Sequence, residues 1–204
     1  RSHALLDWEY DRASLAGYAQ DEFFFTDDLS LTLGGRTEWF DNRVRNTASA
    51  SSFSTRESAL EAALLYRPGE NAKVYAKAGR FYHAPFIDEI FAGAGTPNLA
   101  LAPETGLNLE IGTEARIASE WLAALSLYHM TLEDEIYYDP AVYQNRNSPG
   151  DTRRIGLDAA LRWSRARVGS FALAYGAVRS EFTGGPYDDN RMPLVPTQTL
   201  GVNG

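Results

Sequence analysis

Apolar and polar residues alternate along several segments of the chain, each about 10 to 16 residues long. The alternation is clearest in residues 29–39, 107–116 and 154–163. Because successive side chains of a β-strand point to opposite faces, each segment is predicted to be a strand with one apolar and one polar face. The predicted apolar face carries Leu29, Leu31, Leu33, Leu107, Leu109, Ile111, Leu157, Leu161 and Trp163. The predicted polar face carries Arg36, Glu38, Glu110, Glu114, Asp158 and Arg162.

Two further segments fit this pattern less simply. Residues 56–67 have the composition of a helix, with leucines and glutamates spaced four positions apart, yet they also alternate as a strand would. Residues 121–135 alternate as well, but Leu122 and Leu125 fall on opposite sides, so the sequence leaves the facing of this segment open.

Short and long interruptions follow one another strictly between the predicted strands. Short turns are expected at residues 26–28, 67–71, 118–120 and 164–167, and long polar loops at residues 42–55, 83–105, 139–153 and 182–197. This order requires residues 56–67 to be a strand. A ten-residue strand rises about 33 Å, and a tilt of roughly 45° leaves about 23 Å of height, close to the apolar band of an outer-membrane barrel.

Aromatic residues gather at both ends of the predicted strands. Those beside the short turns are Phe23, Phe24, Phe25, Tyr66, Trp121 and Trp163, and those at the opposite ends are Trp39, Phe40, Phe81, Tyr82, Tyr137 and Tyr138. Two aromatic levels are typical of the interfacial girdles of a membrane barrel, although aromatic residues also favour strands in soluble proteins. The pattern predicts an all-β, antiparallel transmembrane β-barrel of which about nine strands are visible, with the apolar face toward lipid and the polar face toward the lumen. A soluble β-sandwich is the structural alternative.

Composition narrows the classes of function. The 204 residues include 19 Lys and Arg against 27 Asp and Glu, a formal net charge of −8, so the electrostatic attraction that nucleic-acid binding requires is missing. There is no cysteine, which excludes disulfide scaffolds, thiol catalysis and cysteine-ligated zinc. The sequence contains no run of 18 apolar residues, which a membrane-spanning helix would require. The chain begins at Arg1 and is expected to be a piece of a longer protein.

One stretch, residues 81–112, carries a series of short motifs: Tyr82, His83, Ala84 and Pro85, then Thr96, Pro97, Asn98 and Leu99, then Pro103 and Glu104, then Glu110, Ile111 and Gly112. In order and spacing these resemble the Phe-Arg-Ala-Pro-like box, the Asn-Pro-Asn-Leu-like box, the Pro-Glu pair and the Glu-x-Gly strand of TonB-dependent outer-membrane receptors. Residues 18–41 and 152–163 resemble two other strand regions of that family. The resemblance covers roughly residues 14 to 200.

The resemblance implies a barrel of about 22 strands, plugged by an N-terminal domain, that imports a scarce nutrient with energy passed on by TonB from the inner membrane. Residues 1–204 would then be part of the barrel domain, with the plug and the remaining strands elsewhere in the protein. The expected location is the bacterial outer membrane. The expected partners are outer-membrane lipid, TonB and a ferric siderophore or other metal chelate, with cobalamin-like cargo also open and no cofactor. A passive porin is the alternative function.

The motifs also depart from the family pattern. His83 replaces the arginine of the first box, and Thr96 replaces the first asparagine of the second. Haem-importing members commonly place an iron-binding histidine between the two boxes, whereas residues 86–95 contain none, so haem is the less expected cargo. His83 is more simply read as a hydrogen-bonding residue at a strand end, and His129 as a lumenal or packing residue.

The predicted ligand contacts are aromatic and basic residues of the long loops: Tyr82, His83, Tyr137, Tyr138, Tyr143, Arg146 and Tyr187. Arg80, Arg153 and Arg154 are further cations expected to attract an anionic iron chelate. Enzyme activity is not expected. The AGAG run at 92–95 lacks the Gly-Lys-Ser/Thr ending of a phosphate loop, residues 133–135 are read as a solvated strand end, and residues 187–192 lack the spacing of a calcium loop.

Overall fold

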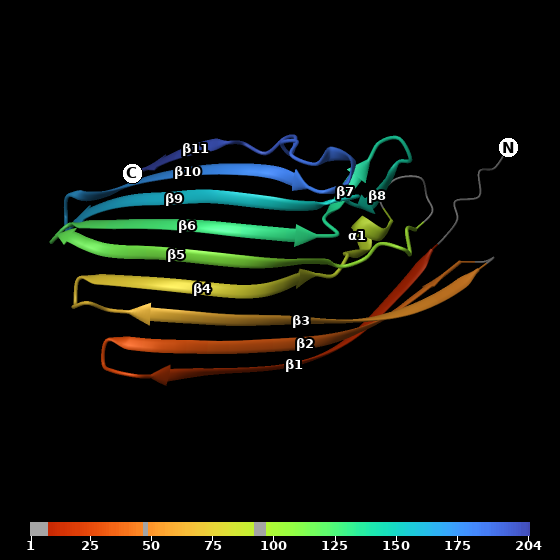
Figure 1. Ribbon diagram of the computed structural model, residues 1–204, viewed down its shortest axis with the longest axis horizontal. Coiled ribbons are helices and arrows are strands. Elements are labelled where there is room, and N and C mark those ends of the chain that lie inside the picture. Colours follow the sequence, from red (N-terminus) through yellow and green to blue (C-terminus); the bar gives the residue numbers. More distant parts are fainter. Residues whose placement is uncertain (1–7, 47–48, 92–96) are drawn as a thin grey trace.

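The computed structural model describes residues 8–46, 49–91 and 97–204, which form one long, curved antiparallel sheet (Figure 1). Its nine strands, in their order across the sheet, are β1 (Glu9–Phe24), β2 (Leu29–Arg45), β3 (Ala50–Tyr66), β4 (Ala72–His83), β5 (Glu104–Ala118), β6 (Trp121–Glu133), β9 (Asp151–Arg165), β10 (Gly169–Thr183) and β11 (Gln198–Asn203). A separate hairpin, β7 (Ile136–Asp139) and β8 (Gln144–Asn147), is inserted between β6 and β9. The all-β antiparallel prediction and the count of nine strands are confirmed.

Two short helical segments complete the described elements. They are the helix α1 (Ile87–Ile90) in the loop after β4 and the 3₁₀ turn η1 (Gly185–Tyr187) in the loop after β10. Within the described ranges, neither these segments nor any other helix has the length and apolar character needed to cross a membrane.

The strand register puts the predicted apolar residues on one face of the sheet. Leu31 lies beside Leu64 of β3, and on the other side of β4 a row of neighbours continues through Ile111, Leu127 and Leu157. Arg36, Glu38, Glu110, Glu114, Asp158 and Arg162 fall at alternate positions and so on the opposite face. The assignment of residues to two faces is therefore confirmed.

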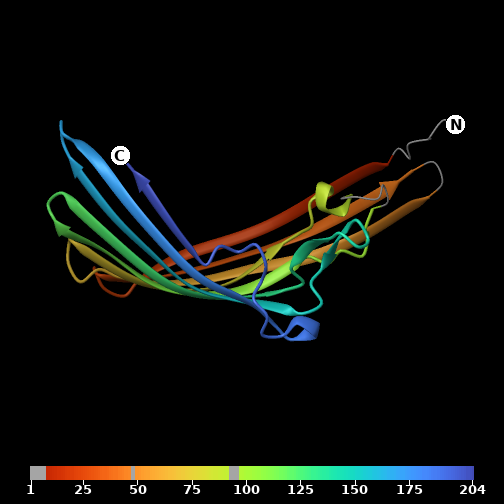
Figure 2. The same ribbon diagram turned by 90° about the horizontal axis from the view of Figure 1, so that it is seen from above.

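The curvature of the sheet distinguishes the two faces. Figure 2 shows the strands arched, with α1 and the β7–β8 hairpin on the concave side. The loop carrying α1 is bound by Arg12, which shares the polar face with its register partner Asn42. The polar face is therefore the concave one, as the inner wall of a barrel requires, and the apolar face is convex.

The two ambiguous segments are both strands in the structure. Residues 56–66 lie in β3, because the ladders to β2 and β4 satisfy their backbone groups and override their helical propensity. In β6, Leu125 and Leu127 face the convex side. His129 lies beside Leu109 and Ile155 on that same convex face, so of the two expected roles, lumenal or packing, the lumenal one is wrong.

The first predicted long loop is also wrong. Residues 42–55 were expected to interrupt the chain, but β2 continues to Arg45 and β3 starts at Ala50, in register throughout. Outside the apolar band both faces of a strand meet water or polar groups, so polar residues such as Ser51 and Ser52 no longer reveal the alternation. The β2–β3 hairpin extends well past the end of β4 (Figure 1).

Cross-strand pairs of tyrosine and glycine line the concave wall. Tyr75 lies opposite Gly112, and Tyr128 lies opposite Gly156. A Cβ atom built on either glycine would overlap the tyrosine ring, so the ring lies flat over the glycine backbone. Only glycine leaves room for this packing, which strengthens strand pairs where glycine itself offers no side chain.

Candidate functional site

The described parts of the loop between β4 and β5, residues 84–91 and 97–103, lie over the concave face. Arg12 of β1 donates from Nη2 to the carbonyl oxygen of Pro85 at 2.8 Å, and its Nε donates to Asn42 at 2.7 Å. The Phe91 ring packs edge-on against Tyr10, with ring centroids 6.1 Å apart. This loop and the β7–β8 hairpin together form what we call the mouth, at the long-loop end of the sheet (Figure 2). Thr96 of the second box lies outside the described residues.

His83, the last residue of β4, contacts two residues of this loop, Glu89 and Phe86. Its Nε2 lies 3.0 Å from Oε2 of Glu89, and its ring packs against Phe86 with centroids 4.7 Å apart. The same carboxylate oxygen accepts the backbone N–H of Phe86 at 2.7 Å, where α1 begins. The structure thus places His83 where the sequence indicated a hydrogen-bonding residue at a strand end.

Tyr82 links β4 to β2 across the position where β3 and β4 diverge. The backbone pairing of β3 with β4 ends at Leu60 and Arg80. The hydroxyl of Tyr82 donates a hydrogen bond to the carboxylate of Glu38 at 2.8 Å. Nη2 of Arg36 donates to the same carboxylate at 2.7 Å.

A ladder of asparagines joins the loop to the hairpin. Asn145 donates from its amide nitrogen to the carbonyl of Glu89 at 3.0 Å, while its own carbonyl accepts from Asn98 at 2.7 Å. Asn147 exchanges two hydrogen bonds with the backbone of Ala102, at 2.9 and 3.0 Å. Asn98 belongs to the second sequence box, so the structure gives that box a role in fixing the mouth.

The hairpin presents three of the predicted contact tyrosines to solvent. Tyr137, Tyr138 and Tyr143 are 40%, 49% and 63% exposed, and Tyr143 holds a left-handed backbone conformation with φ 54° at the hairpin tip. Beside them Arg146 pairs with Asp139 at 3.3 Å and stays largely exposed. Tyr137 and Arg146 are register partners on one face of the hairpin, and Tyr138 lies on the other face. We call these four residues, which lie on both faces and at the tip of the hairpin, the hairpin cluster.

The remaining predicted contacts do not join this cluster. Tyr187 packs against Phe182 with centroids 5.7 Å apart, and η1 lies on the convex side of the sheet, away from the hairpin (Figure 2). Arg153 lies on the convex face, and Arg80 turns back to pair with Glu57 of β3. Strand alternation and an ion pair therefore direct these two arginines away from the mouth, and the structure does not bring them together with the hairpin cluster.

Acidic residues at the base of the hairpin have structural partners. Glu135 pairs with Arg154 at 2.5 Å and accepts from the hydroxyl of Thr152 at 2.6 Å. Glu104 accepts the backbone N–H of Ile136 at the loop end of β5, beyond the apolar band, where burial raises the pKa of its carboxyl. Among the described residues no three His, Cys, Asp or Glu side chains converge as they would around a metal ion.

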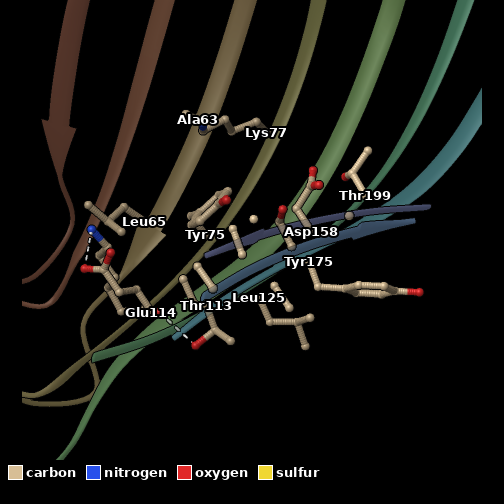
Figure 3. A pocket seen from close by; sticks show the side chains of 18 of the residues that line it. Ala63, Leu65, Tyr75, Lys77, Thr113, Glu114, Leu125, Asp158, Tyr175 and Thr199 are labelled. Atoms are coloured by element: carbon tan, nitrogen blue, oxygen red, sulfur yellow. Dashed lines mark hydrogen bonds and ion pairs between the residues drawn. The ribbon is translucent and has the colours of Figure 1, made fainter. Parts of the chain in front are cut away.

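Below the mouth the sheet forms a hollow of about 810 Å³ that is lined by apolar side chains such as Leu65 and Leu125 as well as by polar ones (Figure 3). Tyr75 donates to Glu110, and Lys73 pairs with Glu114 at 3.0 Å. Asp158 and Thr199 project from the strands on the other side of the hollow (Figure 3). The hollow thus combines charges of both signs with small and apolar residues.

Sequence reasoning missed the residues that hold the mouth together. Arg12 and Pro85 are 73 positions apart, and Glu89 and Asn145 are 56 apart. Nothing in the local sequence marks such long-range side-chain bonds. The one available signal was the second box, whose Asn98 was noted only as part of a resemblance.

Comparison with known proteins agrees with this architecture. Residues 5–204 match the family model described as TonB dependent receptor-like, beta-barrel. The pesticin receptor of Yersinia pestis is 26% identical over 203 residues, which covers 94% of this chain and 30% of that protein.

Solved structures share the fold. The ferric-catecholate import receptor Fiu from E. coli K12 superposes with a TM-score of 0.77 at 18% identity, covering 97% of this chain and 32% of that one. The ferric yersiniabactin uptake receptor FyuA from Yersinia pestis gives a TM-score of 0.72 at 18% identity, with 96% and 31% covered. The chain thus spans about a third of the length of these relatives.

The family match covers nearly the whole chain, and the structure supplies the open antiparallel sheet, the apolar convex face and the polar concave wall that such a barrel needs. The chain belongs to the TonB dependent receptor-like β-barrel family, proteins of the bacterial outer membrane.

Proposed function

We propose that the whole protein is a receptor that binds a ferric siderophore or similar metal chelate at the mouth and imports it with energy delivered through TonB. The observation that carries the proposal is the hairpin cluster, three exposed tyrosines and an arginine on a hairpin that the asparagine ladder holds at the lumenal entrance. A plug domain and the remaining strands are proposed to lie in other parts of the protein.

The chemistry of the cluster suits such a ligand. Tyrosine rings offer flat apolar surfaces with a hydroxyl at the edge, which stack on or hydrogen-bond aromatic and amide groups of a chelator. Arg146 adds an exposed cation that attracts an anionic chelate. The ferric-catecholate and ferric yersiniabactin receptors that share the fold favour a ferric chelate over a passive solute.

The test uses the full-length receptor in cells that lack other routes of iron uptake. Radiolabelled ferric chelates with catecholate, hydroxamate or carboxylate donors are offered to cells with and without functional TonB. We expect one class to be taken up, and only when TonB is present. Uptake of small solutes that does not depend on TonB would contradict the proposal and support a porin.

The role of the hairpin cluster is tested separately. Replacing Tyr138 and Tyr143 by alanine should weaken binding of the imported chelate by about tenfold or more, since stacking contributes on the order of 1 kcal/mol per ring. Tyr187→Ala is the control, because Tyr187 is as exposed as Tyr138 but lies in the loop after β10, where it packs against Phe182, and not in the hairpin. Equal losses in the two variants would refute the assignment of the contact residues while leaving import itself standing.

A further inference from the structure

Two titratable side chains lie side by side where the loop that carries α1 leaves and rejoins the sheet. His83 ends β4, Glu104 begins β5, and the two are register partners. Register partners of an antiparallel pair project from the same face of the sheet, so their side chains are close enough to interact. The loop thus starts at a basic group and ends at an acidic one.

Each of these two side chains holds a different part of the mouth. Nε2 of His83 lies 3.0 Å from Oε2 and 3.3 Å from Oε1 of Glu89 in α1, and the ring packs against Phe86. Glu104 accepts the backbone N–H of Ile136, the first residue of the β7–β8 hairpin. The loop and the hairpin are therefore both attached to the wall at this one point.

Acidic groups surround this point of attachment. Burial is the main cause that raises the pKa of the Glu104 carboxyl, and the charges of Glu135 and Glu89 raise it further, whereas His83 lowers it. Both of the other glutamates therefore lie within electrostatic range of Glu104. When the imidazole of His83 is neutral, the carboxylates of Glu89 and Glu104 repel each other across the attachment of the loop.

Two arginines that reach this part of the mouth are bonded to other groups. Arg154 pairs with Glu135 at 2.5 Å. Arg12 of β1 donates to two neutral groups, the carbonyl of Pro85 and the side chain of an asparagine. Within the described residues, the group left to neutralise the carboxylates of α1 and β5 is His83, and it does so only while its imidazole carries a proton.

The titrations of the two partners act in the same direction. A proton on His83 turns its contact with Glu89 into an ion pair, and a proton on Glu104 removes the charge that repels Glu89. Because the pKa of Glu104 is raised, its proton stabilises the folded mouth at low pH, and this contribution is lost as the pH rises through that pKa. Lower pH therefore tightens the attachment of the loop, and higher pH loosens it.

We propose that His83 is a pH-sensitive latch of the mouth. As an imidazolium it bridges Glu89 and Glu104 and holds the loop on the wall, and as a neutral imidazole it lets residues 84–91 loosen. Histidine is the side chain that ordinarily changes its charge between pH 5 and 8, so the latch responds to modest changes in the pH of the medium. The latch acts on the mouth itself, whichever ligand the mouth binds.

The test follows the mobility of the loop in the full-length receptor. After removal of any native cysteines, a nitroxide is attached to a cysteine at Ile87, which is 52% exposed at the start of α1. Electron paramagnetic resonance of the protein in lipid vesicles gives the ratio of mobile to immobilised label at pH 6 and at pH 8. We expect this ratio to rise about fivefold from pH 6 to pH 8, the effect of losing a partly exposed ion pair.

Two substitutions of His83 bracket the behaviour of the wild type. His83→Gln is neutral at both pH values and should leave the label mobile at both. His83→Arg is charged at both pH values and should keep the label immobilised at both. His129→Gln is the matched control, because this second described histidine lies on the convex face, and the variant should respond to pH as the wild type does.

Three results would overturn the proposal. The first is a wild-type ratio that is the same at pH 6 and pH 8. The second is a full response in His83→Gln, because another group would then titrate, and Glu104→Gln shows whether that group is Glu104. The third is an equal response from a label at Asn71, at the short-turn end, because the whole barrel would then loosen with pH and not the loop.

Discussion

The wall of the sheet and the mouth are built by different interactions, although the same strands run through both. In the wall, continuous backbone ladders satisfy the peptide groups, and the side chains are sorted into an apolar convex and a polar concave face. At the mouth, side chains bond to the backbone of distant segments, as Arg12 does to Pro85 and Asn145 to Glu89. A wall of this kind tolerates polar substitutions on one face only, whereas a mouth of this kind depends on a few specific bonds.

The largest effect is expected when a charge is placed on each face of the wall in turn, which tests the difference between the apolar and the polar face. Leu109→Arg should destabilise the barrel by as much as about 2 to 4 kcal/mol, the cost of an arginine at the membrane midplane, because Leu109 lies within the apolar band of the convex face. Glu110→Arg, on the concave face, should cost far less. Urea unfolding of the full-length protein in lipid vesicles measures both free energies, and equal costs would show that the two faces are not as the structure has them.

A second test addresses the packing of the concave wall. Gly112→Ala should cost about 1 to 3 kcal/mol, since the added methyl group overlaps the Tyr75 ring. In a Tyr75→Ala background the same change should cost much less. A double-mutant cycle on the same unfolding assay gives the coupling energy, and a coupling near zero would mean that the ring does not lie over the glycine.

A smaller and more local effect is expected at the mouth. Asn145→Ala removes the hydrogen bond to the Glu89 carbonyl, worth about 0.5 to 1.5 kcal/mol, and should loosen residues 84–91 while leaving the wall intact. Hydrogen exchange of the loop and of β5 distinguishes the two regions. Asn71→Ala, at the short-turn end, is the control and should leave exchange at the mouth unchanged. Faster exchange in β5 as well would mean that mouth and wall unfold together.

The difference between the wall and the mouth also explains which features of the structure could be predicted from the sequence. The two faces of β2, β5 and β9 were predictable residue by residue, because contact with lipid or water imposes a period of two on each strand. The strand character of residues 56–67 followed from their place between a long and a short connection.

Outside the apolar band, where lipid no longer imposes a period of two on the strands, the predictions from the sequence were wrong or incomplete. The β2–β3 hairpin continues through residues 42–55 with polar residues on both faces. His129 occupies a convex position that its polarity did not suggest, at the loop end of the apolar band. The bonds of Arg12 and Asn145 depend on how segments far apart in the chain meet, which no local pattern records.

The convex wall is expected to face lipid, and we propose that the hairpin cluster faces the outside of the cell and binds the ligand. Single cysteines placed at Leu109, Glu110 and Tyr143 of the full-length receptor, after removal of any native cysteines, allow this to be measured with a membrane-impermeant maleimide in intact cells. We expect rapid labelling at 143, slowed by the imported ferric chelate, and none at 109. Labelling at 109 as fast as at 143, or labelling at 143 that is indifferent to the chelate, would contradict it.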